Sequence, residues 1–289
     1  MSLARPAAQY RPGAGYPQTA GGYCYNLAMR RPLTASALAI AALLAAPAAA
    51  QVPGEPITVN PAAAGKASHL IIDIRTSDDP KAGGRAPESA ILAAANGFKF
   101  DPHARTETCS ADQAKANNCP GNSKIGSGTA DATVSNGVVS QPVTADIEMF
   151  LTPPLKAGDV AGVVLHIKER STGAQGNTSG RIVKTSGTFG IEVRFEDLAA
   201  ANAAAPQGYT VRIDRIQADV GASHTEKVTK YKTVKTKSGK KKKVPYKVKV
   251  VHDLIRNPKT CAGSWPYQVR LRYSASDESV RDGSVTCSG

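Results

Sequence analysis

The sequence predicts an all-β fold, an antiparallel β-sandwich from which one long lysine-rich hairpin projects. Runs of alternating or β-branched residues recur along the chain, clusters of Gly, Pro, Asn and Asp separate them, and a long helical period is lacking. Short strands with frequent turns are typical of immunoglobulin-like or jelly-roll-like sandwiches. The strands are expected at residues 69–75, 143–151, 160–168, 188–195, 209–220, 267–273 and 279–286. Helix is expected in only two places: residues 110–117, where Ser110 would cap a short turn, and residues 197–204.

The residues that precede the predicted β domain indicate export. Residues 29–50 contain two arginines, a short apolar run and an A-x-A site, which are the three parts of a secretory signal. The run is shorter than the roughly 20 apolar residues that span a membrane. We therefore expect a secreted or envelope-associated protein with no transmembrane segment after signal removal. Residues 1–28 are interpreted as a disordered upstream extension, residues 51–66 as a linker, and residues 67–289 as a single domain.

Four cysteines remain once the signal is removed, namely Cys109, Cys119, Cys261 and Cys287. An even number of cysteines in an exported chain indicates disulfides, and four cysteines allow three connectivities. Pairing of nearest neighbours closes two short loops, so we expect Cys109–Cys119 and Cys261–Cys287. Structural zinc sites require closer cysteine spacing than this chain has. The cysteines are therefore assigned a structural role, and no metal or other cofactor is predicted.

Residues 224–252 differ in composition from the rest of the chain. Eleven lysines lie between Lys227 and Lys249, with no acidic residue among them. The chain has a formal net charge of +13, of which residues 1–50 contribute four arginines and no acid. Residues 51–289 thus carry +9, and −2 when the eleven lysines are set aside. The basic character of the exported part comes from this one segment.

The lysine-rich segment is predicted to form a hairpin that turns at residues 238–239. A two-residue loop would place Tyr231 opposite Tyr246 and Lys230 opposite Lys247. It would also place Pro245 in a non-hydrogen-bonded pair, where its missing N–H costs nothing. Because side chains alternate along a strand, one face would carry Thr, Val and Tyr and the other lysine. The candidate polyanion-binding residues are Lys230, Lys232, Lys241, Lys243, Lys247 and Lys249.

Two interpretations of the lysines stay open at this stage. Charged residues on an exposed strand edge prevent aggregation, and the lysines would then need no ligand. Alternatively, they bind an anionic wall polymer or an acidic polysaccharide. Two tyrosines are few for base stacking, so the composition argues against nucleic acid as the partner.

No catalytic motif is found in the sequence: it contains no G-x-S-x-G elbow, P-loop, dinucleotide fingerprint or H-E-x-x-H pair. The predicted function is an exported, non-catalytic β module that binds envelope polymers. One alternative is a secreted glycan hydrolase, since carboxylate pairs that form in space are invisible in sequence. Alternate strand positions, typical of a solvated face, are occupied by acidic residues such as Asp146, Glu148, Glu192 and Glu196. Another is a structural subunit that pairs through the hairpin tyrosines. His224 and His252 are expected to face each other at the hairpin base without forming a metal site.

Two motifs carry a resemblance to a known group of proteins. Residues 97–134 contain G-F-x-F-D-P, then two cysteines and the run C-P-G-N-S-K-I-G, and residues 254–265 read LIRNPKTCAGSW. Both resemble uncharacterised exported β-sandwich proteins of high-GC actinobacteria, with a C-x-n-C-P-x-x-S-x-[IV]-G unit and a C-terminal N-P-x-T-C-x-G-S-W motif. The resemblance covers most of residues 67–289. It implies export, two local disulfides and a β domain with Trp265 in the core, and it implies no activity.

Overall fold

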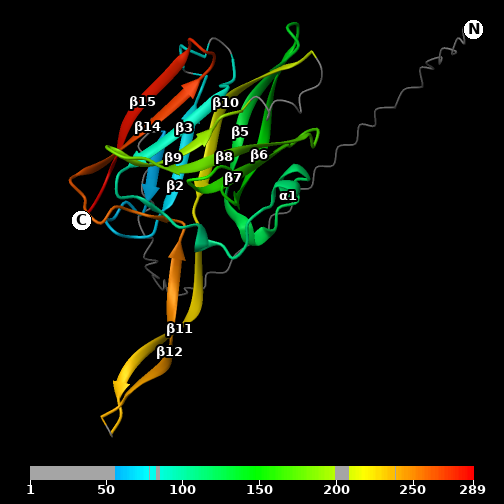
Figure 1. The fold of residues 1–289 in the computed structure, drawn as a ribbon. Coiled ribbons are helices and arrows are strands. Elements are labelled where there is room, and N and C mark those ends of the chain that lie inside the picture. Colours follow the sequence, from blue (N-terminus) through cyan, green and yellow to red (C-terminus); the bar gives the residue numbers. More distant parts are fainter. Residues whose placement is uncertain (1–55, 78, 83–84, 199–207, 238) are drawn as a thin grey trace, which may run out of the picture. The chain divides into compact units, whose positions relative to one another are not determined.

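The computed structural model describes residues 56–77, 79–82, 85–198, 208–237 and 239–289. Its regular secondary structure is nearly all antiparallel β, which confirms the predicted fold class (Figure 1). The strands are β1 (Ile57–Asn60), β2 (His69–Arg75), β3 (Ser89–Ala95), β4 (Lys99–Phe100), β5 (Lys124–Ser135), β6 (Ser140–Thr152), β7 (Asp159–Glu169), β8 (Gln175–Lys184), β9 (Phe189–Phe195), β10 (Thr210–Val220), β11 (Ser223–Lys235), β12 (Lys241–Asp253), β13 (Ile255–Arg256), β14 (Ser264–Arg272) and β15 (Glu278–Thr286). The helical elements are η1 (Pro102–Ala104), α1 (Ala111–Lys115) and η2 (Gly121–Ser123).

Among the described strands, eleven form one continuous antiparallel sheet, in the order β1-β2-β10-β5-β6-β7-β8-β9-β3-β14-β15. The sheet folds over until its two edges approach each other. There the Ala64 N–H donates to the Ser288 carbonyl at 2.9 Å, and the Ser288 N–H donates to the Ala62 carbonyl at 2.8 Å. The layers of the predicted sandwich are therefore parts of one nearly closed sheet.

The predicted linker over residues 51–66 is wrong from Ile57 onward. β1 pairs with β2, and Ile57 and Val59 are only 2% and 5% exposed. The segment was too short and too rich in Pro and Ala for its alternation to stand out. The signal segment, the upstream extension and residues 199–204 of the second predicted helix lie outside the described residues.

Besides β1 and the two-residue strands β4 and β13, the prediction missed β3, β5 and β8, which are rich in Ala, Gly or Ser. Their small residues are required by packing. A Cβ at Gly128 would lie 2.0 Å from the Gln217 carbonyl oxygen on β10, and one at Gly180 would lie 2.7 Å from the Phe195 ring. Low β-propensity was therefore a sign of close approach between neighbouring segments.

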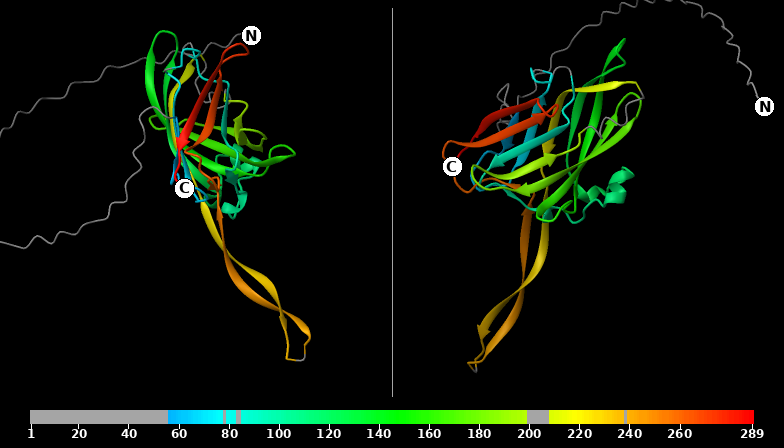
Figure 2. Two further views of the ribbon diagram at one scale, coloured as in Figure 1. Left: turned by 90° about the vertical axis from the view of Figure 1, so that its left-hand side faces the viewer. Right: turned by 45° about the horizontal axis from the view of Figure 1, so that its top comes forward.

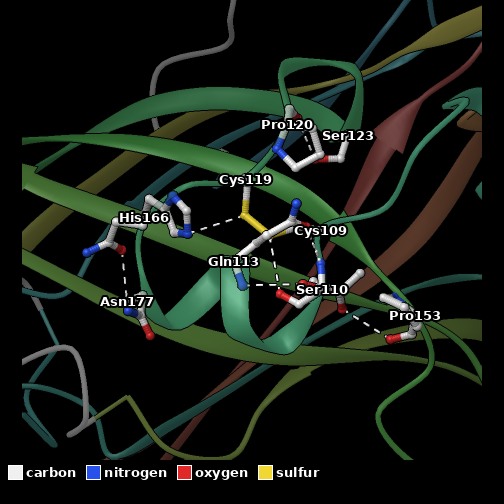
Figure 3. The surroundings of a disulfide bond; sticks show 11 residues. Cys109, Ser110, Gln113, Cys119, Pro120, Ser123, Pro153, His166 and Asn177 are labelled. Carbon is white, nitrogen blue, oxygen red and sulfur yellow. Dashed lines mark hydrogen bonds between the residues drawn. A yellow bond between two sulfur atoms is a disulfide. The ribbon is translucent and has the colours of Figure 1, made fainter.

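The inner face of the sheet carries the apolar core, and a smaller cluster lies on the outer face beneath α1. In that cluster Phe150 and Val164 pack against Cys109. Figure 3 shows how the segment is held: Cys109 and Cys119 form a disulfide, and Ser110 and Gln113 cap α1 with reciprocal hydrogen bonds. This confirms the first predicted helix and its Ser110 cap.

Both predicted disulfides are present, with Cα–Cα distances of 5.0 Å for Cys109–Cys119 and 5.9 Å for Cys261–Cys287. Trp265 lies in the core as expected, 5% exposed and edge-on to Phe98 with ring centroids 5.4 Å apart. None of the described helices is long and apolar enough to cross a membrane.

Candidate functional site

The predicted hairpin exists, but its register differs by one residue from the prediction. β11 and β12 pair only with each other, and they extend away from the folded sheet (Figure 2). Lys235 pairs with Lys241, and the Thr236 N–H donates to the Lys240 carbonyl at 2.8 Å. The connection is thus longer than two residues, and Gly239 adopts the left-handed conformation (φ +79°) that such loops require. Ser238 lies outside the described residues.

The shifted register overturns the predicted separation of lysines from apolar residues. Tyr231 lies opposite Pro245, whereas Lys230 lies opposite Tyr246, so neither the tyrosine pair nor a Lys230–Lys247 pair exists. By alternation, one surface of the ribbon, here called the lysine face, carries Lys227, Lys235, Lys241, Lys243, Lys247 and Lys249 with Tyr231. The other surface, the valine face, carries Val228, Val234, Val244, Val248 and Val250 with Lys230, Lys232, Lys242 and Tyr246.

Four of the six candidate lysines therefore share a face, and the other two, Lys230 and Lys232, lie on the opposite one. All eleven hairpin lysines are exposed. Within the described part of the chain, the ion pairs of lysine involve only Lys124 on β5 and Lys156 in the loop between β6 and β7. The hairpin charge is thus left without a carboxylate partner from the described chain.

Like charges face each other directly on the lysine face. Lys227 pairs with Lys249 and Lys235 with Lys241. Since the pair Thr236–Lys240 is hydrogen-bonded, alternation makes both lysine pairs non-hydrogen-bonded, the type with the closer side chains. Directly opposed like charges destabilise a strand pair.

The base of the hairpin is fixed to the folded sheet by a group of polar residues. His252 Nδ1 lies 2.7 Å from Asp101 Oδ2, and its Nε2 lies 3.2 Å from Glu226 Oε1. The hydrogen bond with Asp101 and then that with Glu226 raise the pKa of His252. His224 pairs with His252 across the strands, as predicted. Beneath them the Leu254 side chain is fully buried.

Sequence reasoning missed Asp101 and His103, which approach His252 from the turn between β4 and η1. Among the described residues, these three place potential metal ligands within 4.8 Å of one another. Their atoms already pair: His103 Nδ1 lies 2.9 Å from Asp101 Oδ1. We interpret the cluster as the polar anchor of the hairpin, because its hydrogen bonds are satisfied without an ion. Asp101 and His252 are 151 residues apart in the sequence, so no local motif predicted this contact.

A second candidate binding site is a polar hollow of about 850 Å³ on the outer face of β2, β10 and β5–β8. His166 lies there, with its Nε2 3.4 Å from Cys119 Sγ (Figure 3). Burial lowers the pKa of His166. The three carboxylates of the hollow each have a partner: Asp146 pairs with Arg170 at 2.7 Å, Glu148 with Lys124 at 2.6 Å and Asp219 with His69 at 2.7 Å.

The pKa of Asp146 does not match that of the acid that a glycan hydrolase uses. The general acid in such enzymes has a raised pKa, whereas the hydrogen bond from Arg170 lowers the pKa of Asp146. The other two carboxylates considered from the sequence, Glu192 and Glu196, pair with arginines as well. Glu192 is only 7% exposed, so its predicted place on a solvated face is wrong.

Comparison of the chain with protein-family models, curated proteins and solved structures gives no match. The resemblance to exported actinobacterial proteins therefore stays a prediction.

Proposed function

We propose that this protein is an extracytoplasmic, non-catalytic module that binds an anionic polymer through its lysine-rich hairpin. The observation that supports this most directly is the pairing of Lys227 with Lys249 and of Lys235 with Lys241 on a ribbon with no carboxylate partner among the described residues. An isolated two-stranded hairpin is marginally stable by itself, and opposed like charges weaken it further. A polyanion that lies along the ribbon removes this repulsion.

The length and spacing of the charges favour a polymer over a small anion. Each strand has 13 residues and therefore spans roughly 43 Å at about 3.3 Å per residue. Lys241 and Lys243, and again Lys247 and Lys249, follow each other at two-residue steps of roughly 7 Å. A chain with regularly repeated negative charges can contact several of these lysines at once.

The chemistry of the ribbon favours an acidic polysaccharide or wall polymer over nucleic acid. Tyr231 and Tyr246 are 66% and 40% exposed but lie on opposite faces, so they cannot form one stacking surface. Binding to single-stranded nucleic acid relies on such surfaces. The expected export of the chain also gives it access to envelope polymers.

The test is binding of the protein to teichoic acid over a series of salt concentrations, with uncharged dextran as the negative control. In the test variant the six lysines of the lysine face become glutamine. The matched control carries the same change at six exposed lysines of the folded sheet and its loops: Lys66, Lys81, Lys115, Lys168, Lys184 and Lys259.

The test variant should lose binding, and the control should keep it with the same steep salt dependence. Equal losses in both variants would show that only net charge matters and would overturn the proposal. A finer comparison uses Lys243, Lys247 and Lys249 against Lys230, Lys232 and Lys242, three glutamines on each face. The lysine-face triple should weaken binding more if the polymer lies along that face.

A role as a structural subunit remains the competing outcome. The predicted tyrosine pair is absent, but Tyr231 is exposed and both hairpin edges are unpaired in the described structure. Light scattering of the full chain, with and without the polymer, separates the two. Association that occurs without polymer and disappears when Tyr231 and Tyr246 become serine would favour subunit pairing.

A further inference from the structure

The interior of the nearly closed sheet contains an apolar cavity of about 210 Å³. Side chains from both parts of the folded sheet line it, including Leu70, Ile72, Leu92, Leu165, Ile191 and Ile216. These side chains point inward but are only half-buried. The remaining exposure of such residues is toward the cavity, so the two parts of the sheet enclose the space without filling it.

The division of the core leads to the same conclusion. The buried residues form two separate inner clusters, one around Leu151 and Val163 and the other around Val269 and Tyr273. Ile72 contacts both clusters and lines the cavity. Protein interiors are normally packed as densely as organic crystals. An apolar cavity larger than about 150 Å³ excludes water and takes up apolar molecules such as benzene.

Lys99 gives the cavity a polar end. It is the one charged residue among the described residues that line the cavity, and its side chain is also exposed to solvent. Its neighbours Phe98 and Phe100 pack against the core, so by alternation the Lys99 side chain runs outward from the cavity lining into solvent. No carboxylate of the described chain pairs with Lys99, whereas Arg256, its neighbour across the β4–β13 pair, is bonded to Asp253.

We propose that the interior binds a single-chain amphipathic carboxylate, with the alkyl chain in the cavity and the carboxylate at Lys99. The apolar lining selects the chain, and the unpaired ammonium group selects a negative head over a neutral or positive one. This site is separate from the lysine and valine faces of the hairpin, and it rests on none of the observations that support polymer binding.

The single tryptophan of the chain makes the proposal testable on the full protein. Trp265 lines the cavity, and its Nε1–H donates to the Thr260 carbonyl at 3.0 Å. Entry of a ligand should change its fluorescence in a saturable way. The probes are octanoate, decanoate and dodecanoate below their micelle concentrations, with dodecanol and dodecyltrimethylammonium as head-group controls.

Affinity should rise about fourfold for each added methylene and stop rising when the cavity is full. Dodecanoate should bind more tightly than dodecanol, and the cation should bind least. A rise that continues without limit indicates adsorption on the surface and would overturn the proposal, as would the absence of any saturable change with all three chains.

Two variants locate the ligand. Lys99→Gln should weaken dodecanoate binding about tenfold and remove its advantage over dodecanol, while Lys184→Gln, a matched change outside the cavity, should have no effect. Ala94→Phe places a ring into the cavity and should abolish binding of every chain. Circular dichroism checks that this variant folds, and Ala90→Phe replaces it if it does not. Unchanged binding in the folded Phe variant would show that the ligand lies elsewhere.

Discussion

The folded sheet and the hairpin follow opposite rules for charge and for apolar surface. In the sheet, acidic residues pair with arginines, as in Arg181–Asp159 and Arg281–Asp79, whose carboxylates are only 1% exposed. Its apolar residues face inward around the cavity. On the hairpin the lysines have no acidic partner among the described residues, and the valines of the valine face remain half-buried.

The buried core lies in the folded sheet, whereas the net positive charge lies on the hairpin. Without the eleven hairpin lysines, residues 51–289 carry −2, so the rest of this part nearly neutralises its own charge. The two hairpin strands pair with no other described strand, and the base of the hairpin is held by Leu254 and the Asp101–His252 contact. The two regions should therefore respond differently to the same kind of change.

The largest expected difference comes from deleting apolar atoms in each region. Leu151→Ala should lower the free energy of unfolding by about 2–5 kcal/mol, because Leu151 is fully buried in the sheet. Val244→Ala on the valine face should change it by less than about 0.5 kcal/mol. Denaturant unfolding followed by Trp265 fluorescence measures both. Equal losses would show that the hairpin unfolds together with the sheet.

Removing one disulfide should have the next largest effect, and only on the sheet. Cys261 and Cys287 are 26 residues apart and join the segments that flank β14 and β15. The double change to alanine should cost about 3–4 kcal/mol on the chain-entropy model. The denaturant midpoint should fall, while proteolysis at the hairpin lysines keeps its rate in the native protein. Faster cleavage there would contradict the independence of the two regions.

The sequence predicted the strands with clear alternation and could not predict those built from small residues. β2 has the predicted bounds, and β6, β7, β9, β10, β14 and β15 differ from theirs by a few residues. β5 and β8 were missed because close approach to a neighbouring segment, as at Gly128, favours glycine over residues with high β-propensity. The cavity was equally invisible, because its lining residues are scattered along the chain and meet only through sheet closure.

The hairpin register shows a more specific limit. Pro245 occupies a non-hydrogen-bonded position in the observed register, and it would do so in the predicted one as well. This agreement could therefore not distinguish the two registers. The turn determines the register. Because its loop contains a left-handed Gly239 and is longer than two residues, every cross-strand partner is shifted by one residue from the prediction.

A charge reversal tests that register directly. Lys227→Glu places a carboxylate opposite Lys249 and should stabilise the hairpin near its base by about 0.2–1 kcal/mol. Lys230→Glu, a matched change opposite Tyr246, should stabilise it less. Amide hydrogen exchange of β11 and β12 measures both effects. In the predicted register Lys227 would face Val250 and Lys230 would face Lys247, so Lys230→Glu would then be the more stabilising change.

The smallest expected effect is a pH dependence at the hairpin base, where the two regions meet. The pKa of His252 is raised above its usual 6.5 by the hydrogen bonds with Asp101 and Glu226. Protonated His252 is therefore favoured in the folded base. Its contribution is fully present below pH 6.5 and is lost as pH rises through the raised pKa.

Asp101 sets the acidic limit of the same contact. Although burial alone would raise its pKa, the hydrogen bonds with His252 and His103 lower it below 3.8. Its contribution is present above pH 3.8 and is lost as pH falls through the lowered pKa. Exchange protection of the hairpin base should thus be greatest between these limits and decline toward alkaline pH.

His252→Gln should remove the alkaline decline of this protection. His69→Gln changes a histidine that pairs with Asp219 on the folded sheet, and it should leave the decline intact. A decline that persists in the His252 variant would assign the titration to another group and leave the anchor of the hairpin to Leu254 alone.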